Sequence, residues 1–217
     1  MPPLSEPWPI DSSGAWRQYF VARGGGPPGV PILFLDRDGV LVEEVHYLHR
    51  PEDTRVYPPA INLIRRFNAE GWRVVVVTNQ AGIGRGYYGW ADFSAVNEHL
   101  LKAFSACGAV IDGVLAAPHH ADGIGRYQVV DHPMRKPNPG MFLDAIAYFG
   151  ADAEKSIVIG DRASDLRAGQ SAGLGRGILV RTGYGCAEEQ SVRALSGPSF
   201  RIEVIDNLDL FPADWLA

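Results

Sequence analysis

The sequence predicts an α/β fold built on a doubly wound parallel sheet. Short apolar runs alternate along the chain with segments in which apolar residues recur at helical spacing. The runs at 32–35 and 74–77, the second made of four valines, have the continuous apolar character of strands that are buried on both faces. Strands separated by helices form βαβ units, so we expect a parallel sheet covered by helices on both sides.

The expected elements follow from these patterns in chain order. We expect strands at 32–35, 74–77, 114–117, 157–159, 177–180 and 202–205, and helices at 59–70, 91–106, 139–149 and 164–172. The first helix places Leu63, Ile64 and Phe67 on one face and stops at Gly71. Prolines and three consecutive glycines predict an irregular N-terminal arm over residues 1–29, with one helical turn near 13–21, and a single compact domain over residues 30–217.

Composition excludes several classes of function. The chain has 217 residues, of which 46% are hydrophobic and 21% charged, so it can bury a sizeable core. A net charge of −5 with scattered lysines and arginines lacks the positive surface that binding to nucleic acid or an anionic membrane requires. Two cysteines without C-x-x-C spacing predict a reducing compartment, and no apolar run resembles a membrane span or a signal peptide. We expect a cytoplasmic monomer or small homo-oligomer whose partner is a small molecule.

Polar residues directly follow several of the predicted strands. In open parallel sheets, ligands bind beyond the carboxyl ends of the strands. The polar residues near these ends are Asp36 and Asp38, Thr78 and Asn79, Asp161 with Asp165 a turn later, and the pair Arg135 and Lys136 before the helix at 139–149. Each pattern alone is also typical of an ordinary turn, a helix cap or a solvated surface pair. Together they bring carboxylates, a hydroxyl and an ammonium group to one edge of the sheet, which no structural need explains.

This set of groups suits phosphoryl transfer through an aspartyl intermediate. A carboxylate such as Asp36 can attack phosphorus and divide the reaction into two displacements. Neighbouring carboxylates and phosphate oxygens are ligands that Mg²⁺ prefers. The Thr78 hydroxyl and the Lys136 ammonium group would meet the charge on the transferring group. Asp38, two residues after the nucleophile, would protonate the leaving group and later deprotonate the attacking water.

Four sequence strings occur in the order of a known family. They are D-R-D-G-V at 36–40, V-T-N-Q-A-G-I-G-R-G at 77–86, R-K-P-N-P-G-M at 135–141 and I-G-D-R-A-S-D at 159–165. On these strings the chain resembles phosphatases of the haloacid-dehalogenase (HAD) superfamily, and more narrowly the heptose-1,7-bisphosphate phosphatase and histidinol-phosphatase branch. The resemblance covers residues 30–185. It implies a Rossmann-type, HAD-like core with a minimal cap, in a Mg²⁺-dependent enzyme that hydrolyses a small phosphorylated sugar, with heptose 1,7-bisphosphate as the favoured substrate.

The resemblance also implies roles for the matching residues. The catalytic residues would be the nucleophile Asp36, the general acid and base Asp38, Thr78 and Lys136. The ligands of Mg²⁺ would be the Asp36 carboxylate, the Asp38 backbone carbonyl and Asp161, with Asp165 supporting the metal site from behind. The residues that bind the substrate would be Asn79, Arg135 and Arg85.

One departure from the family's pattern concerns zinc. Many members of the branch carry a zinc loop of the pattern C-x-H…C-x-C, and the matching positions here are Ala117, His119, His132 and Met134. Alanine has no donor atom and methionine is a poor zinc ligand, so zinc is not expected, although His120 adds a third imidazole. We expect the loop at 118–134 to be held by turn residues and by apolar anchors instead. The expected anchors are Tyr127, Val129, Val130 and Met134.

Other functions remain open from the sequence. A non-enzymatic phosphoacceptor module also combines Asp, Thr and Lys around Mg²⁺, but such modules are shorter than this chain and do not begin with D-x-D on the first strand. A dehalogenase of the same fold would need neither Mg²⁺ nor the acid Asp38. Among phosphatases, histidinol phosphate is the alternative substrate, because the core motifs do not distinguish it from heptose bisphosphate. We expect the loops at 43–52 and 81–88 to decide between substrates.

Overall fold

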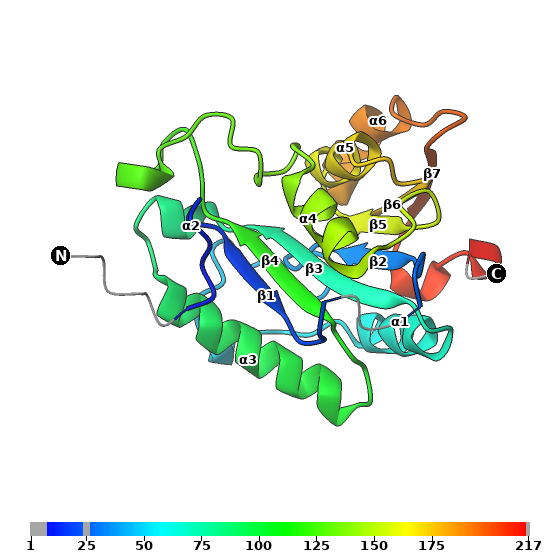
Figure 1. Cartoon of the computed structure of the whole chain (residues 1–217), viewed down its shortest axis with the longest axis horizontal. Helices are drawn as coiled ribbons and strands as arrows, with labels where there is room; N and C mark the ends of the chain where they lie inside the picture. The colour runs from blue at the N-terminus through cyan, green and yellow to red at the C-terminus, as the bar shows by residue number, and fades with distance from the viewer. Residues whose placement is uncertain (1–7, 24–26, 216–217) are drawn as a thin grey trace.

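A computed structural model describes residues 8–23 and 27–215 of the chain. A seven-stranded sheet lies at its centre in the order β1-β4-β3-β2-β5-β6-β7 (Figure 1). The strands are β1 (Trp16–Tyr19), β2 (Ile32–Leu35), β3 (Arg73–Asn79), β4 (Gly113–Ala117), β5 (Ile157–Gly160), β6 (Arg176–Val180) and β7 (Arg201–Ile205). The helices are α1 (Pro58–Ala69), α2 (Ala81–Gly84), α3 (Trp90–Ala106), α4 (Gly140–Phe149), α5 (Ala163–Ser171) and α6 (Gly185–Arg193). Short 3₁₀ helices lie at Pro51–Asp53, Gly125–Tyr127, Leu208–Leu210 and Ala213–Trp215.

The predicted fold class is confirmed. Strands β2 to β7 pair in parallel, and only β1 runs antiparallel to its neighbour β4 among the described strands. Successive residues of a strand face opposite sides, so Leu33 packs in the apolar cluster that includes residues of α1 and α3. Phe34 packs in the cluster on the other face, with residues of α4 and α5. Figure 1 shows these two groups of helices on opposite sides of the sheet.

The strand order creates a switch point at β2. The chain continues from β2 to β3 and β4 on one side of the sheet and then crosses to β5 on the other side of β2. A crevice therefore opens beyond the adjacent carboxyl ends of β2 and β5, which is where ligands bind in sheets of this type. Residues 36 and 161, which follow these two strands, lie at this crevice.

The N-terminal segment differs from the expectation. Residues 16–19 form the edge strand β1, paired with β4, instead of a helical turn within an irregular arm. Trp16 is buried against Trp90 and Phe93 of α3, so the sheet and its core begin before residue 30. The pairing partner lies about a hundred residues later in the chain, and local sequence patterns do not record such a contact. The parts of the predicted arm at 1–7 and 24–26 lie outside the described residues.

Helices α2 and α6 were not among the expected elements. All six predicted strands and all four predicted helices form, with ends that shift by no more than a few residues. None of the helices within residues 8–23 and 27–215 is both long enough and apolar enough to span a bilayer.

Candidate active site

Three carboxylates gather at the switch point. Asp36 follows β2, Asp161 follows β5, and Asp165 lies in the first turn of α5. Each is buried, and each offers an oxygen atom within 4.8 Å of one from the other two. The structure therefore brings together the two carboxylates that the sequence predicts as metal ligands and Asp165, which the sequence predicts as a support of the same site.

Burial and mutual repulsion perturb these carboxylates strongly. Burial, with the charges of Asp165 and Asp38, raises the pKa of Asp36 to about 7, although Lys136 opposes the shift. Burial and the charges of Asp36 and Asp165 raise the pKa of Asp161 to about 8. In addition, Oδ1 of Asp161 is buried without a hydrogen-bond partner. An all-oxygen cluster with an unpaired carboxylate oxygen fits a hard divalent cation such as Mg²⁺.

A glycine lets the chain pass closely over this cluster. Gly39 follows the D-R-D triplet with a φ of 82°, and a Cβ atom at this position would collide with the carboxylate of Asp161. The glycine in the string at 36–40 is thus required by both the backbone conformation and the space. Oδ2 of Asp161 also accepts a hydrogen bond from the backbone N–H of Tyr184 at 2.8 Å.

Lys136 is the cation buried beside the carboxylates. Its Nζ lies 3.0 Å from Oδ1 of Asp36 and 2.7 Å from Oδ1 of Asp165, and it donates to the backbone carbonyl of Val77 at 2.7 Å. Burial lowers the pKa of Lys136, but the two carboxylates outweigh burial and raise it. The ammonium group therefore stays charged next to Asp36, where a phosphoryl group would arrive.

The side chain of Asn79 is occupied by the backbone of Lys136. Its Nδ2 donates to the Lys136 carbonyl at 2.9 Å, and its Oδ1 accepts from the Lys136 N–H at 3.1 Å. The structure places this amide where it fixes the position of Lys136, and the sequence-based assignment of Asn79 to substrate binding stays a prediction. Asn79 also lines the cavity, and the second N–H of its amide is not used by either of these two hydrogen bonds.

Thr78 and Asp38 lie on the other side of Asp36. Thr78 is the penultimate residue of β3, and its Oγ1 accepts a hydrogen bond from Nε2 of Gln80 at 2.8 Å. The carboxylate of Asp38 accepts from Arg37 at 3.1 and 2.9 Å and from Gln80 at 3.1 Å. Asp38 is thereby held in one orientation by donors that come from β2's end and from the β3–α2 turn.

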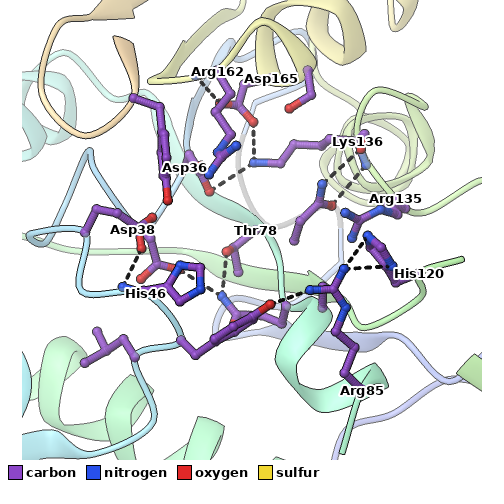
Figure 2. Close-up of a pocket in the computed structure, with 18 of the residues that line it drawn as sticks. Asp36, Asp38, His46, Thr78, Arg85, His120, Arg135, Lys136, Arg162 and Asp165 are labelled. Carbon is purple, nitrogen blue, oxygen red and sulfur yellow. Dashed lines mark hydrogen bonds and ion pairs between the residues drawn. The ribbon is translucent and has the colours of Figure 1, made fainter. Parts of the chain in front are cut away.

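A cavity of about 440 Å³ opens in front of these residues. Asp36 and Asp38 line one side of it, and Arg85, Arg135 and His120 gather on another (Figure 2). Arg85 donates to the Tyr47 hydroxyl, to His120 and to the exposed carboxylate of Asp122. The cavity therefore has a carboxylate pole with Lys136 and a separate cationic pole.

Arg135 is the least neutralised cation of this second pole. Its NH1 group is buried with no hydrogen-bond partner. Burial, and then the nearby charges of Arg85 and Arg162, lower the pKa of Arg135. Burial, followed by the charges of Arg135 and Arg85, likewise lowers the pKa of His120. Crowded cations with an open donor form a site for an anion.

The loop at 118–134 is braced by the N-terminal segment. His119 is fully buried, its ring stacks on His132 with centroids 3.4 Å apart, and its Nε2 donates to the Ser13 carbonyl at 2.8 Å. Tyr127 packs against the core and accepts from Nε1 of Trp90 at 3.0 Å. Burial comes first among the causes that lower the pKa of both stacked histidines.

The predicted apolar anchors of this loop are only partly right. Tyr127 packs against one core cluster and Met134 against the other. Val130 was expected to be an anchor, but its side chain is 82% exposed. A further contact comes from outside the loop, because the backbone carbonyl of Ser13 accepts a hydrogen bond from His119, and the sequence did not connect these two segments.

Several cavity residues were not predicted individually, although the loops at 43–52 and 81–88, which were expected to decide between substrates, contribute some of them. These residues are His46, Tyr47, Gln80, Tyr88, His120, Arg162 and Tyr184. Gln80 and Arg162 directly follow residues that were predicted, so their place after a strand could have identified them. His46 and Tyr47 belong to a loop whose two consecutive positive φ values, 49° and 67°, carry no sequence signal, because neither residue is a glycine.

Comparisons with known proteins agree on one family. The HAD-hydrolase-like family model matches residues 133–208. A relative from Mesorhizobium japonicum, named D-glycero-beta-D-manno-heptose-1,7-bisphosphate 7-phosphatase, is 42% identical over 177 residues, which cover 80% of this chain and 80% of the relative. The crystal structure of a HAD-like phosphatase from Mesorhizobium loti is similar with a TM-score of 0.84 and 38% identity, over 97% of this chain and 95% of that one. The crystal structure of D,D-heptose 1,7-bisphosphate phosphatase from B. bronchiseptica, complexed with magnesium and phosphate, has a TM-score of 0.69 and 28% identity over 82% of this chain and 94% of that one.

The chain belongs to the HAD superfamily of hydrolases. Within the superfamily it falls in the heptose-1,7-bisphosphate phosphatase branch, as its four sequence strings predict, and it is a phosphoric monoester hydrolase.

Proposed function

We propose that this enzyme uses Mg²⁺ to remove the 7-phosphate of D-glycero-β-D-manno-heptose 1,7-bisphosphate. The observation that carries the proposal is the cavity with two poles, because a bisphosphate places one phosphate at each end of a small sugar. The carboxylate pole with Lys136 suits the phosphate that is cleaved, and the cationic pole around Arg135 suits the one that stays. The name of the relative from M. japonicum supports this substrate.

In the first displacement, a carboxylate oxygen of Asp36 attacks the phosphorus atom. A bond forms between that oxygen and phosphorus while the bond from phosphorus to the sugar oxygen breaks. Asp38 gives its proton to the sugar oxygen as it leaves. The Lys136 ammonium group and the Thr78 hydroxyl lie close to Asp36 and offset the negative charge on the transferring group.

In the second displacement, water attacks the phosphorus atom of the aspartyl phosphate. Asp38, now a carboxylate, accepts a proton from this water, and the bond from Asp36 to phosphorus breaks. Free phosphate leaves and both aspartates return to their starting states. The side chain of Asn79 contributes indirectly, since its two hydrogen bonds fix the backbone of Lys136.

The residues that would hold Mg²⁺ are Asp36 and Asp161, together with the backbone carbonyl of Asp38. A bound Mg²⁺ neutralises the carboxylates and the phosphate oxygens that they would otherwise repel. Asp165 supports this site without binding the metal, since one of its oxygens contacts Lys136 and the other accepts from the backbone N–H of Arg162. The complex of the B. bronchiseptica enzyme with magnesium and phosphate supports the choice of Mg²⁺ as the metal.

The distal phosphate binds at the cationic pole. Arg135 has an open guanidinium donor, and a phosphate dianion would relieve its repulsion with Arg85. Arg85 is placed for the same phosphate by its contacts with Tyr47 and His120. A substrate with one phosphate leaves this pole empty, so the enzyme should prefer bisphosphates.

The test is a comparison of kcat/KM between substrates in the presence of Mg²⁺. Heptose 1,7-bisphosphate should exceed both heptose 7-phosphate and histidinol phosphate by at least about tenfold, which corresponds to about 1.4 kcal/mol in the barrier. Arg135→Met should lower kcat/KM for the bisphosphate by about 10-fold to 100-fold and should change the value for heptose 7-phosphate by less than about threefold. A ratio below one against histidinol phosphate would contradict the substrate assignment, and both anomers of the bisphosphate belong in the comparison.

A further inference from the structure

Arg37 is a fully buried charge that the proposed reaction does not use. Its side chain is 1% exposed and does not line the cavity. Its Nε and NH2 groups donate to the two oxygens of Asp38 at 3.1 and 2.9 Å. Its guanidinium carbon lies 5.4 Å from the centre of the Phe93 ring. Burial lowers the pKa of Arg37, but the charge of Asp38, its hydrogen bonds with Arg37 and the charges of Tyr88 and Asp36 together outweigh burial and raise it.

Gln80 completes the set of donors around Asp38. Its Nε2 donates to Oδ2 of Asp38 at 3.1 Å and to Oγ1 of Thr78 at 2.8 Å. Its Oε1 accepts from the Tyr88 hydroxyl at 2.6 Å and from Arg37 at 3.3 Å. All the hydrogen-bonding capacity of this buried amide is therefore used, and its orientation is fixed.

The ring of Tyr88 is in turn held in place. Gly82 leaves the space that it needs, since a Cβ atom there would collide with the rings of Tyr88 and Tyr47. His49 stacks on Tyr88 with ring centroids 5.5 Å apart. Hydrogen bonds thus connect Tyr88 through Gln80 to both Asp38 and Thr78. Arg37 completes this network, since it donates to both Asp38 and Gln80.

We propose that Arg37 and Gln80 are positioning residues, which hold the carboxylate of Asp38 and the Thr78 hydroxyl in the positions that phosphoryl transfer requires. This inference rests on the proposed function, because it takes Asp38 as the acid and base of both displacements. Proton transfer depends on the placement of the acid within hydrogen-bonding distance of the leaving oxygen. A two-pronged guanidinium contact restrains both rotation and tilt of the carboxylate, which a single donor does not.

A purely structural role predicts a different result. Arg37 stabilises the fold through its burial and its contact with Phe93 whatever Asp38 does in the reaction. Loss of that stability would slow the enzyme by the same factor with or without a functional Asp38. Loss of positioning would matter only while Asp38 transfers protons.

A double-mutant cycle separates these two roles. The variants are Arg37→Met, Asp38→Asn and the combination, assayed by phosphate release from the best substrate with Mg²⁺. We expect Arg37→Met to lower kcat by about 10-fold to 100-fold, the cost of a misplaced catalytic group, with KM within about threefold because Arg37 does not touch the cavity. Added to Asp38→Asn, the same change should lower kcat by less than about threefold. Arg37→Lys keeps the positive charge but loses the two-pronged contact with Asp38, so it should recover only part of the lost kcat.

Gln80→Met provides a second cycle if Arg37→Met does not fold. It removes both amide donors at nearly the same length, and its effect on kcat should also shrink in the Asp38→Asn background. If the change at residue 37 or 80 lowers kcat by the same factor in the wild-type and in the Asp38→Asn enzyme, the positioning role is overturned, while the proposed function stays intact. A wild-type kcat for Asp38→Asn would instead contradict the proposed function, and the positioning role with it.

Discussion

Replacing Trp16 with alanine tests whether the N-terminal segment belongs to the core. Trp16 is 2% exposed in strand β1, and its ring lies 5.1 Å from that of Phe93 and 5.6 Å from that of Trp90, between centroids. A tryptophan side chain buries about 200 Å² or more, and burial of apolar surface contributes about 25 cal/mol per Å². This gives about 5 kcal/mol, within the range of about 3–5 kcal/mol measured when large aromatic residues are truncated in cores.

Urea unfolding with linear extrapolation measures this change. We expect Trp16→Ala to lower the free energy of unfolding by about 3–5 kcal/mol. The matched control is Phe20→Ala, because Phe20 lies just beyond the same strand but is 44% exposed; this change should cost about 1 kcal/mol or less. Equal small losses for the two variants would refute the reasoning and would mean that the segment is only a loosely attached arm.

The remaining predictions concern protons and metals. Asp36 and Asp161 have raised pKa values of about 7 and 8, so the folded, metal-free protein binds protons that the unfolded chain has lost. Its unfolding free energy should therefore fall as pH rises from about 4 to 8. Mg²⁺ should restore more stability at pH 8 than at pH 5. Asp161→Asn should weaken this dependence of stability on pH, measured by thermal unfolding. Elemental analysis of the purified protein should find no stoichiometric zinc. The double change His119→Ala with His132→Ala should alter kcat by less than about tenfold, or 1.4 kcal/mol, whereas one zinc per chain, lost in that variant, would contradict this prediction.

The parallel core was predictable because its signals are local. The apolar runs of β2 and β3 and the helical spacing in α1 appear within single windows of sequence. Strand β1 was missed because its stability comes from pairing with β4 and from the contact of Trp16 with α3. Short strands of this kind are decided by tertiary packing, which no window around residues 16–19 contains.

In the candidate site, too, some features were predictable from the sequence and others were not. The residues that follow strands, such as Asp36 and Asp161, could be predicted because the topology of a parallel sheet brings strand ends together. The partners of side chains could not be predicted. Nothing in the sequence indicates that the Asn79 amide binds the backbone of Lys136, or that Ser13 meets His119. Such contacts depend on the path of loops between elements, and these loops have no periodic pattern.

Phosphate release by Asp36→Asn tests the proposed chemistry most directly. Asparagine is nearly the same shape as aspartate but a far weaker nucleophile, so the variant should fold with an unchanged unfolding midpoint in the presence of Mg²⁺. The wild-type enzyme should release many equivalents of phosphate from heptose 1,7-bisphosphate, and Asp36→Asn should release none above background. Wild-type turnover by the purified variant, or a wild-type enzyme that stops after one equivalent, would contradict a hydrolytic cycle through an aspartyl phosphate at Asp36.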